Sequence, residues 1–280
     1  MTSAVLKIGG ELVSDPASLQ AVLRDVAALV EGGWRIVICH GGGPQASALQ
    51  ERLGLEARKV GGRRITDEAT LQVMKCVLAG EVSVDLVAAA SAAGIRAVGI
   101  SGVSAGLVTA RRRPPMVVSG GGPDPVDFGL VGDVVEIRTG LVEHLLAGGF
   151  TPVVNTLGID AAATGATCPV YNINADTVAA ALAAALRVDH LFALTNVPGV
   201  LRDRSDPESR IPRLDEASAR AAIAGGVIVG GMIPKVEEAL DNLAQGIGAV
   251  HILGVGAGAL LDEAQRPGSR GTVLLAERAS

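Results

Sequence analysis

Ala4-Val5-Leu6-Lys7-Ile8-Gly9-Gly10-Glu11 is a short apolar run that contains one lysine and ends in a glycine pair. Such a run predicts a buried strand, and because an unpartnered buried ammonium is costly, we expect Lys7 to point out at the strand's carboxyl end. Open α/β sheets bind their ligands at that edge. Without a Cβ, Gly9 and Gly10 would let an anion approach their backbone N–H groups. Taken alone, the stretch also fits an ordinary strand–helix turn with a solvent-seeking lysine.

A second strand and glycine-rich turn repeat this pattern. A helix that Asp15-Pro16 opens leads to the apolar run 35–39, which ends in His40-Gly41-Gly42-Gly43-Pro44 and a helix to about residue 53. The right-handed crossover rule makes the two strands parallel, so both glycine turns lie on one edge and predict an anion-binding site. His40 could act as a general base. No Ser or Cys nucleophile accompanies it, so we interpret it as a strand-end histidine bonded to the backbone.

Composition restricts the class of protein. The 280 residues suffice for one large α/β domain or two lobes on a shared sheet, and 49% are hydrophobic but only 2% aromatic. A net charge of -5, with no basic run longer than Arg111-Arg112-Arg113, argues against nucleic-acid binding. Three widely spaced cysteines (Cys39, Cys76 and Cys168) predict reduced thiols in the cytoplasm. The longest apolar run, 178–186, is too short to span a membrane, so no membrane partner is expected.

The middle of the chain offers a candidate clamp and a candidate lid. Arg63 and Arg64 precede a helix predicted from Thr66 or Asp67 to about residue 93, where they could clamp a carboxylate or form a solvated pair. Residues 107–137 alternate short apolar runs with Gly and Pro, which predicts β-hairpins that could form a lid. The other elements expected here are strands over 95–100 and 151–154 and a helix over 140–147.

The second half opens with polar side chains ahead of a buried helix. Asn172, Asn174 and Asp176 precede the wholly apolar run 178–186. One helix cap needs only one such side chain, so we expect a site here, with capping as the alternative. Lys235 lies in the first turn of a helix to about residue 243, where the dipole disfavours a cation unless an anion binds. The other elements expected are strands over 191–194 and 250–253, a loop over 195–200 and a surface hairpin over 202–213.

One edge of a single sheet can be assigned all of these groups: two lysines, several glycine-rich strand ends and one aspartate. The chain contains no GxxxxGK[ST] sequence, so it is not a P-loop nucleotide binder, and the glycines of 254–258 lack the spacing of a dinucleotide fingerprint. Phosphoryl transfer mainly needs positioned groups that neutralise the transferring phosphate. The predicted edge therefore indicates a phosphotransferase.

Five motifs carry a family resemblance over nearly the whole chain. They are Lys7-Ile8-Gly9-Gly10, His40-Gly41-Gly42-Gly43, Arg64-Ile65-Thr66-Asp67, Asn172-Ile173-Asn174-Ala175-Asp176 and Gly230-Gly231-Met232-Ile233-Pro234-Lys235. In that order and spacing the sequence resembles the amino acid kinase superfamily, most closely the members that phosphorylate N-acetyl-L-glutamate in arginine biosynthesis. The resemblance implies an α/β fold with an open, mainly parallel sheet of about eight strands between helix layers. It also implies one domain over 1–280, with an acceptor-binding lobe (1–170) and a nucleotide-binding lobe (171–280).

The resemblance also implies a role for each motif. Lys7 and Lys235 would neutralise the transferring phosphoryl group, and Asp176 would hold both lysines in place. The acceptor would be bound by Gly42, Gly43, Arg64 (at its α-carboxylate), Asn172 and Asn174. ATP with Mg²⁺ would be bound by Gly9, Gly10, Thr195, Asn196, Val197, Pro198, Gly199, Val200, Val227, Ile228 and Val229, with no metal site on the protein itself. Backbone N–H groups of Gly10 and Gly43 would donate to the phosphoryl group.

Several departures from the family pattern leave alternatives open. Arg63 stands where an apolar residue is usual, so it could exchange roles with Arg64, and Asn196 stands where Asp is common. In one branch of the family, an N-terminal helix links dimers into arginine-inhibited hexamers. This chain begins only a few residues before its first strand and lacks that helix, so the resemblance implies a homodimer without strong arginine feedback. A kinase for a longer acylamino acid, such as N-acetyl-aminoadipate, would share the phosphoryl apparatus and differ by one methylene in the acceptor pocket. A non-catalytic amino-acid or nucleotide sensor is the alternative from another class.

Overall fold

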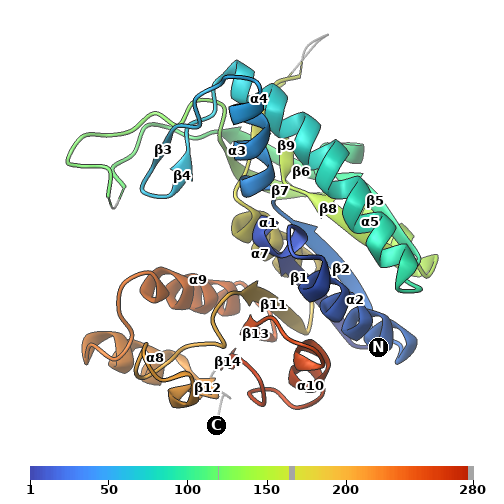
Figure 1. The fold of residues 1–280 in the computed structure, drawn as a ribbon, viewed down its shortest axis with the longest axis vertical. Coiled ribbons are helices and arrows are strands. Elements are labelled where there is room, and N and C mark those ends of the chain that lie inside the picture. The colour runs from blue at the N-terminus through green and yellow to red at the C-terminus, as the bar shows by residue number, and fades with distance from the viewer. Residues whose placement is uncertain (119, 164–167, 277–280) are drawn as a thin grey trace.

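An open sheet of eight strands runs through the protein, whose computed structural model describes residues 1–118, 120–163 and 168–276 (Figure 1). The strand order is β12-β14-β13-β11-β1-β2-β8-β5, and every neighbouring pair is parallel except β13 and β14. The strands are β1 (Ser3–Ile8), β2 (Arg35–His40), β5 (Ala97–Ser101), β8 (Thr151–Asn155), β11 (His190–Thr195), β12 (Arg213–Leu214), β13 (Ala249–Gly254) and β14 (Thr272–Leu275). The predicted open, mainly parallel sheet is confirmed, with β1 near its centre.

Helices cover both faces of this sheet, as a mainly parallel sheet requires. One face carries α2 (Pro16–Glu31), α5 (Ser83–Ala92) and α10 (Ala259–Gln265), and the other carries α6 (Gly140–Ala147), α7 (Ala175–Leu186) and α9 (Met232–Ala244), with α8 (Glu216–Ala224) beside α9. Figure 1 shows the orange-to-red end of the chain at one end of the molecule and the blue-to-green segments at the other. Helix α7 and strand β1 lie where the two parts meet.

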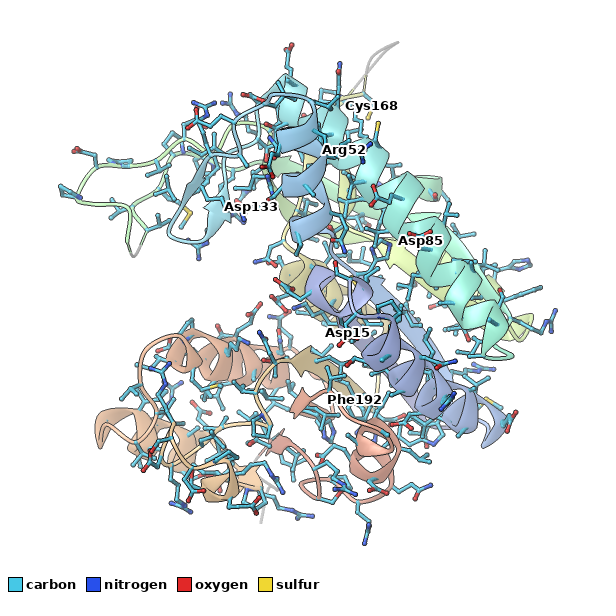
Figure 2. All side chains as sticks on the ribbon, in the orientation of Figure 1. Asp15, Arg52, Asp85, Asp133, Cys168 and Phe192 are labelled. Atoms are coloured by element: carbon cyan, nitrogen blue, oxygen red, sulfur yellow. The ribbon has the colours of Figure 1, made fainter. Side chains whose placement is uncertain are left out.

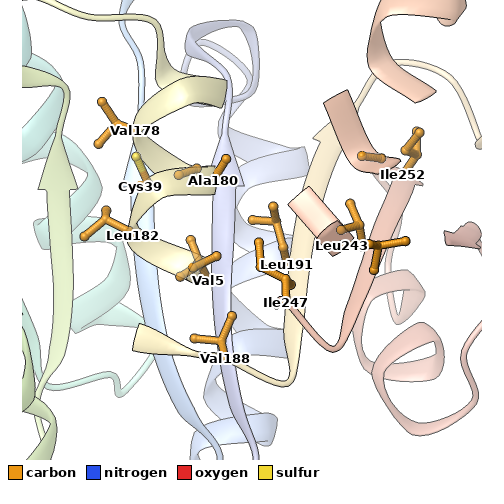
Figure 3. Close-up of a cluster of buried hydrophobic side chains, with 14 of the residues drawn as sticks. Val5, Cys39, Val178, Ala180, Leu182, Val188, Leu191, Leu243, Ile247 and Ile252 are labelled. Atoms are coloured by element: carbon orange, nitrogen blue, oxygen red, sulfur yellow. The ribbon is translucent and has the colours of Figure 1, made fainter. Parts of the chain in front are cut away.

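Helix α7 consists largely of alanine, so it is narrow enough to pack in the core. Its buried side chains include Ala179, Ala183 and Leu182, which belong to one cluster with Val5 of β1 and Leu191 of β11. Figure 3 shows Leu182, Val5 and Leu191 in this cluster. Small side chains let a helix approach a sheet closely, so a chain poor in aromatic residues can still fill this space. Charged side chains such as Asp85 lie on the exposed outer surface of the helices, whereas Phe192 is buried (Figure 2).

A second sheet of four strands and a short hairpin lie beside the main sheet. The four-stranded order is β10-β9-β6-β7, formed by β6 (Val108–Arg112), β7 (Gly132–Ile137), β9 (Leu157–Asp160) and β10 (Val170–Asn172). β3 (Lys59–Val60) pairs with β4 (Arg63–Arg64). The predicted hairpin within 107–137 is confirmed by the antiparallel pair β6–β7. β9 and β10 were not predicted, because runs of four and three residues are too short to show a periodicity.

The long helix predicted from Thr66 or Asp67 to about residue 93 is confirmed over Glu68–Ala92, but part of it is π-helical. Asp67 accepts a hydrogen bond from the backbone N–H of Thr70 at 2.8 Å and caps α4 (Glu68–Lys75), as expected. A π-helical segment, Cys76–Val82, then joins α4 to α5. Its side chains Val77, Leu78 and Val82 pack so tightly on Gly42 that a Cβ there would lie 3.0 to 3.2 Å from each. The predicted helix is therefore present from Glu68 to Ala92, with a π-helical segment in its middle that the sequence did not reveal.

Two further elements differ from the expected ones. Helix α7 begins at Ala175 instead of 178, which puts Asp176 inside its first turn and makes Asn174 the cap. The expected surface hairpin over 202–213 consists of a 3₁₀ turn (η3, Pro207–Ser209), an isolated bridge from Leu201 to Arg210, and β12, which joins the main sheet. The remaining helices are α1 (Gly10–Val13), α3 (Gly43–Arg52) and the 3₁₀ turn η2 (Ser104–Gly106). No helix within the described ranges is both long and apolar enough to cross a bilayer.

Candidate active site

The first lysine motif lies where β1 ends, between β2 and β11. Lys7 is in register with Cys39 on one side and Ala193 on the other. Its Nζ lies 2.8 Å from Oδ1 of Asp176, in the first turn of α7, and the two side chains are 17% and 41% exposed. The ammonium therefore has a carboxylate partner and keeps one side open, as the position at the strand's carboxyl end predicted.

The second lysine reaches the same place from α9. Lys235 lies in the first turn of that helix, and its Nζ donates a hydrogen bond to Oγ1 of Thr195, at the end of β11, at 3.2 Å. Lys7, Asp176, Thr195 and Lys235 all line one small cavity of about 50 Å³, which we call the junction cavity. Two ammonium groups more than two hundred residues apart in sequence thus face one space.

Asp176 forms an ion pair with one of the two lysines in the described parts of the chain. It forms an ion pair with Lys7, whereas no ion pair of 4.0 Å or less joins it to Lys235 among the described residues. Lys235 instead contacts a threonine hydroxyl. The two lysines therefore have different partners in this structure.

Glycine-rich turns form the wall of a larger cavity of about 590 Å³ next to the junction cavity. Helices α1 and α3 begin at Gly10 and Gly43 without a side-chain cap, so their first N–H groups are not used by side chains. A Cβ on Gly10 would lie 3.1 Å from the backbone N of Gly43, so the two turns touch. Among the residues that line this cavity are Lys7, Gly9, Gly10, Gly42, Gly43, Arg63, Arg64, Asn172, Asn174 and Asp176. We call it the glycine-turn cavity.

Arg64 supplies a fixed positive charge to the glycine-turn cavity. Its guanidinium donates to the carbonyl oxygen of Gly43 at 2.8 Å, to Oγ of Ser47 at 2.7 Å and to the side chain of Gln50. Burial lowers the pKa of Arg64, which still leaves the group charged at neutral pH. No ion pair to a carboxylate is found for Arg64 in the part of the chain that the structure describes. Such a guanidinium suits a carboxylate ligand, and Arg63 lies more exposed at the same wall.

A third cavity, of about 440 Å³, lies beyond Lys235. Of the residues expected around a nucleotide, those that line this cavity are Thr195, Asn196, Val197, Gly199, Val227, Ile228 and Val229. Pro198 and Val200 do not line it. Val200 is fully buried, and its backbone N donates to Oγ1 of Thr272 at 2.8 Å. Gly9 and Gly10 lie apart from this cavity, on the glycine-turn side.

The three cavities share walls. Lys7 and Asp176 line both the glycine-turn cavity and the junction cavity, and Thr195 and Lys235 line both the junction cavity and the third one. Two ligands bound in the outer cavities would therefore meet between the lysines. That arrangement can neutralise a phosphoryl group as it passes from one ligand to the other.

His40 contributes packing to this edge. It is fully buried, and its Nδ1 lies 3.1 Å from the carbonyl oxygen of Gly41. Burial lowers the pKa of His40. The interpretation of His40 as a strand-end histidine bonded to the backbone is thus confirmed.

Some residues around the cavities were not found from the sequence. Lys59 and Arg113 line the glycine-turn cavity, Arg204 lines the third cavity, and Glu238 lines the junction cavity. For Glu238 a signal existed, since it follows Lys235 by three positions and so shares a helix face with it. Lys59, Arg113 and Arg204 have no such local signal, because their positions at the cavities depend on how distant segments of the chain pack together.

Comparisons with known proteins show the family of this chain. Residues 3–254 match the pattern of the Amino acid kinase family. The chain is 52% identical over 272 residues to the Acetylglutamate kinase of Sorangium cellulosum (97% of this chain and 94% of the relative), and 52% identical over 275 residues to that of Anaeromyxobacter dehalogenans (98% and 100%).

Solved structures share the fold at lower identity. An N-acetylglutamate synthase from Neisseria gonorrhoeae, complexed with coenzyme A and N-acetyl-glutamate, has a TM-score of 0.78 at 23% identity and covers 98% of this chain and 59% of its own. A carbamate kinase from Giardia has a TM-score of 0.67 at 18% identity, with 99% of each chain covered. Because the family pattern matches most of the sequence and the relatives match over nearly their full length, this chain belongs to the amino acid kinase family.

Proposed function

We propose that this protein transfers the γ-phosphoryl group of ATP to the side-chain carboxylate of N-acetyl-L-glutamate, which forms an acyl phosphate for arginine biosynthesis. The observation that carries the proposal is the junction cavity, where Lys7 and Lys235 face one space between two larger cavities. The relatives named above, which span nearly the whole chain, support this choice of reaction.

The acceptor would lie in the glycine-turn cavity. Arg64 would bind its α-carboxylate, while Asn172 and Asn174 and the backbone of Gly42 would hold the rest of the molecule. The proposed acceptor lobe is 1–170. Residues 172–176 line the same cavity and would contact the acceptor as well. The reacting carboxylate is ionised at neutral pH and is already a nucleophile, so the step needs no general base.

The nucleotide would lie in the third cavity, in the lobe 171–280. Its apolar wall of Val227, Ile228 and Val229 suits a base, and Lys235 at the inner end suits the phosphates. The two ammonium groups and the N–H groups of Gly10 and Gly43 would neutralise charge on the phosphoryl group in flight.

Mg²⁺ would enter with the nucleotide as the MgATP substrate. No group of three or more His, Cys, Asp or Glu side chains among the described residues could hold a metal ion. Mg²⁺ in nucleotide enzymes is bound largely through substrate phosphates and one or two carboxylates. The homodimer and the cytoplasmic location stay predictions of the sequence.

A direct assay tests the reaction. The protein is incubated with MgATP and N-acetyl-L-glutamate, ADP is measured, and the acyl phosphate is trapped with hydroxylamine as a hydroxamate. We expect ADP and hydroxamate in equal amounts, and neither without the acceptor. A higher kcat/KM for N-acetyl-aminoadipate would contradict the proposed acceptor. A folded protein that binds both ligands without ADP release would be a sensor and would contradict the reaction itself.

A further inference from the structure

The imidazole of His40 is a buried polar group beside the glycine-turn cavity. His40 ends β2, directly before the glycines of that cavity, and is fully buried. Its Nδ1 lies 3.1 Å from the carbonyl oxygen of Gly41. A carbonyl oxygen can only accept, so Nδ1 carries the proton of this hydrogen bond. Burial lowers the pKa of His40, so the ring is neutral at neutral pH and Nε2 carries no proton.

Packing alone does not explain a histidine at this position. Nε2 is buried and has no hydrogen-bond partner among the described residues. A buried polar atom without a partner costs free energy that an apolar side chain of similar size would avoid. The useful contact of the ring is therefore the hydrogen bond from Nδ1 to Gly41.

That hydrogen bond holds the peptide group between Gly41 and Gly42. A peptide group with glycine on both sides rotates easily, because neither residue has a Cβ to restrict its backbone angles. On one side, the N–H of Gly41 is anchored by the carbonyl oxygen of Ile8 at 3.1 Å. On the other, a Cβ on Gly42 would lie 3.0 to 3.2 Å from side chains of Cys76–Val82. The freedom that these anchors leave is rotation of the peptide plane, which the bond from His40 opposes.

The orientation of this peptide group decides what faces the cavity. In a trans peptide the C=O and N–H bonds point in opposite directions. The carbonyl of Gly41 is turned toward the buried ring of His40, so the N–H of Gly42 is turned the other way. Gly41 and Gly42 both line the glycine-turn cavity, and the N–H of Gly42 meets no acceptor within the described ranges. Such an N–H group can bind an anion, whereas a carbonyl oxygen in its place would repel one.

We propose that His40 is a positioning residue for the acceptor site. Its Nδ1–H holds the carbonyl of Gly41, and this presents the N–H of Gly42 to a carboxylate of the substrate. The inference rests on the proposed function, which places N-acetyl-L-glutamate in the glycine-turn cavity. His40 itself touches no substrate and transfers no proton.

Two substitutions separate the hydrogen bond from packing. Asparagine places its amide nitrogen near the position of Nδ1 and keeps a donor, but it is smaller than histidine and leaves a cavity. Leucine fills about the same space as histidine and has no donor. A packing role therefore predicts the higher kcat/KM for His40→Leu, whereas a positioning role predicts it for His40→Asn.

Steady-state kinetics of the full-length protein measure this difference. His40→Leu should lower kcat/KM for N-acetyl-L-glutamate roughly ten-fold, the effect of losing one hydrogen bond. The KM for MgATP should stay unchanged, because neither Gly41 nor Gly42 lines the third cavity. His40→Asn should recover most of the kcat/KM for the acceptor. His144→Leu, at an exposed histidine on α6, is the matched control and should behave as wild type.

The order of the variants decides the outcome. A kcat/KM equal to wild type in His40→Leu, or a lower value in His40→Asn than in His40→Leu, would overturn the proposal. Titration with ADP shows that each variant is folded. If His40→Leu is not folded, His40→Gln replaces it, because a glutamine amide reaches the position of Nε2 and leaves Gly41 without its donor.

A binding measurement keeps this proposal separate from the proposed reaction. The Kd of N-acetyl-L-glutamate, measured by calorimetry without nucleotide, should rise roughly ten-fold in His40→Leu and stay close to wild type in His40→Asn. If wild type binds the acceptor but forms no ADP, the proposed reaction fails. The role of His40 is then decided by these Kd values, and equal values in His40→Leu and wild type would refute it.

Discussion

Acidification should destabilise this protein through one partly buried histidine, His190 at the start of β11. Its ring stacks on Trp34 with 5.2 Å between the ring centroids, and its Nδ1 lies 3.0 Å from Nε2 of His251. His251 is fully buried, and its Nδ1 lies 2.8 Å from Oε1 of Glu263. Burial and then the charge of His251 lower the pKa of His190 to about 4, although Asp189 and Glu263 act to raise it.

Proton linkage gives the direction and the size of this loss of stability. The ordinary pKa of a histidine is 6.5, so between that value and about 4 the unfolded chain binds a proton at His190 that the folded chain excludes. The contribution of the neutral His190 to the free energy of unfolding is complete above pH 6.5 and is lost as the pH falls toward 4. It amounts to up to about 2 kcal/mol between about pH 8 and pH 5, less any screening at the exposed part of the ring. Burial acts to raise the pKa of Glu263, but hydrogen bonds from His251 and three backbone N–H groups lower it to about 2, so Glu263 stays ionised over this range.

Urea unfolding at a series of pH values measures this effect. Trp34 is the only tryptophan and stacks on His190, so its fluorescence reports both unfolding and protonation of that ring. The stability difference between wild type and His190→Gln should shrink as the pH falls, because the variant lacks the titrating group. His144→Gln, at an exposed position on α6, is the matched control. A difference that stays constant from pH 8 to pH 5 would refute the reasoning.

Three further outcomes are expected. Lys7→Ala and Lys235→Ala should each lower kcat by roughly 10²–10³, as for one preorganised donor, in the ADP-release assay; wild-type turnover would exclude that lysine from the chemistry. Arg64→Ala should raise the acceptor KM by roughly 10–100-fold, as for a charged hydrogen bond, whereas Arg63→Ala should change it little; the reverse result would assign the clamp to Arg63. Gly129→Ala should lower the free energy of unfolding by at least about 1 kcal/mol in urea titrations, because Gly129 has φ +73 and a Cβ would lie 2.4 Å from the carbonyl oxygen of Thr66. An unchanged midpoint would show that this loop adjusts freely.

The amino-acid sequence by itself determined the central part of the fold. Apolar runs that end in glycine pairs predicted β1 and β2, their parallel pairing and the shared edge, because local periodicity and crossover handedness suffice for that. Capping chemistry located the start of α2 at Asp15 and narrowed that of α4 to Thr66 or Asp67, of which Asp67 is the cap. Site residues that begin or end such elements, such as Lys7 and Gly43, could therefore be named from the chain alone.

Only the tertiary structure decided features that depend on distant contacts. The π-helical segment Cys76–Val82 packs on Gly42, and the short strands β9 and β10 form a sheet with β6, which are contacts between segments far apart in the sequence. The partner of each lysine was likewise not fixed by motif order: Lys7 forms an ion pair with Asp176, whereas Lys235 donates a hydrogen bond to Thr195. A sequence pattern fixes which face of an element a side chain occupies, whereas distances between side chains on different elements are set by how the elements pack.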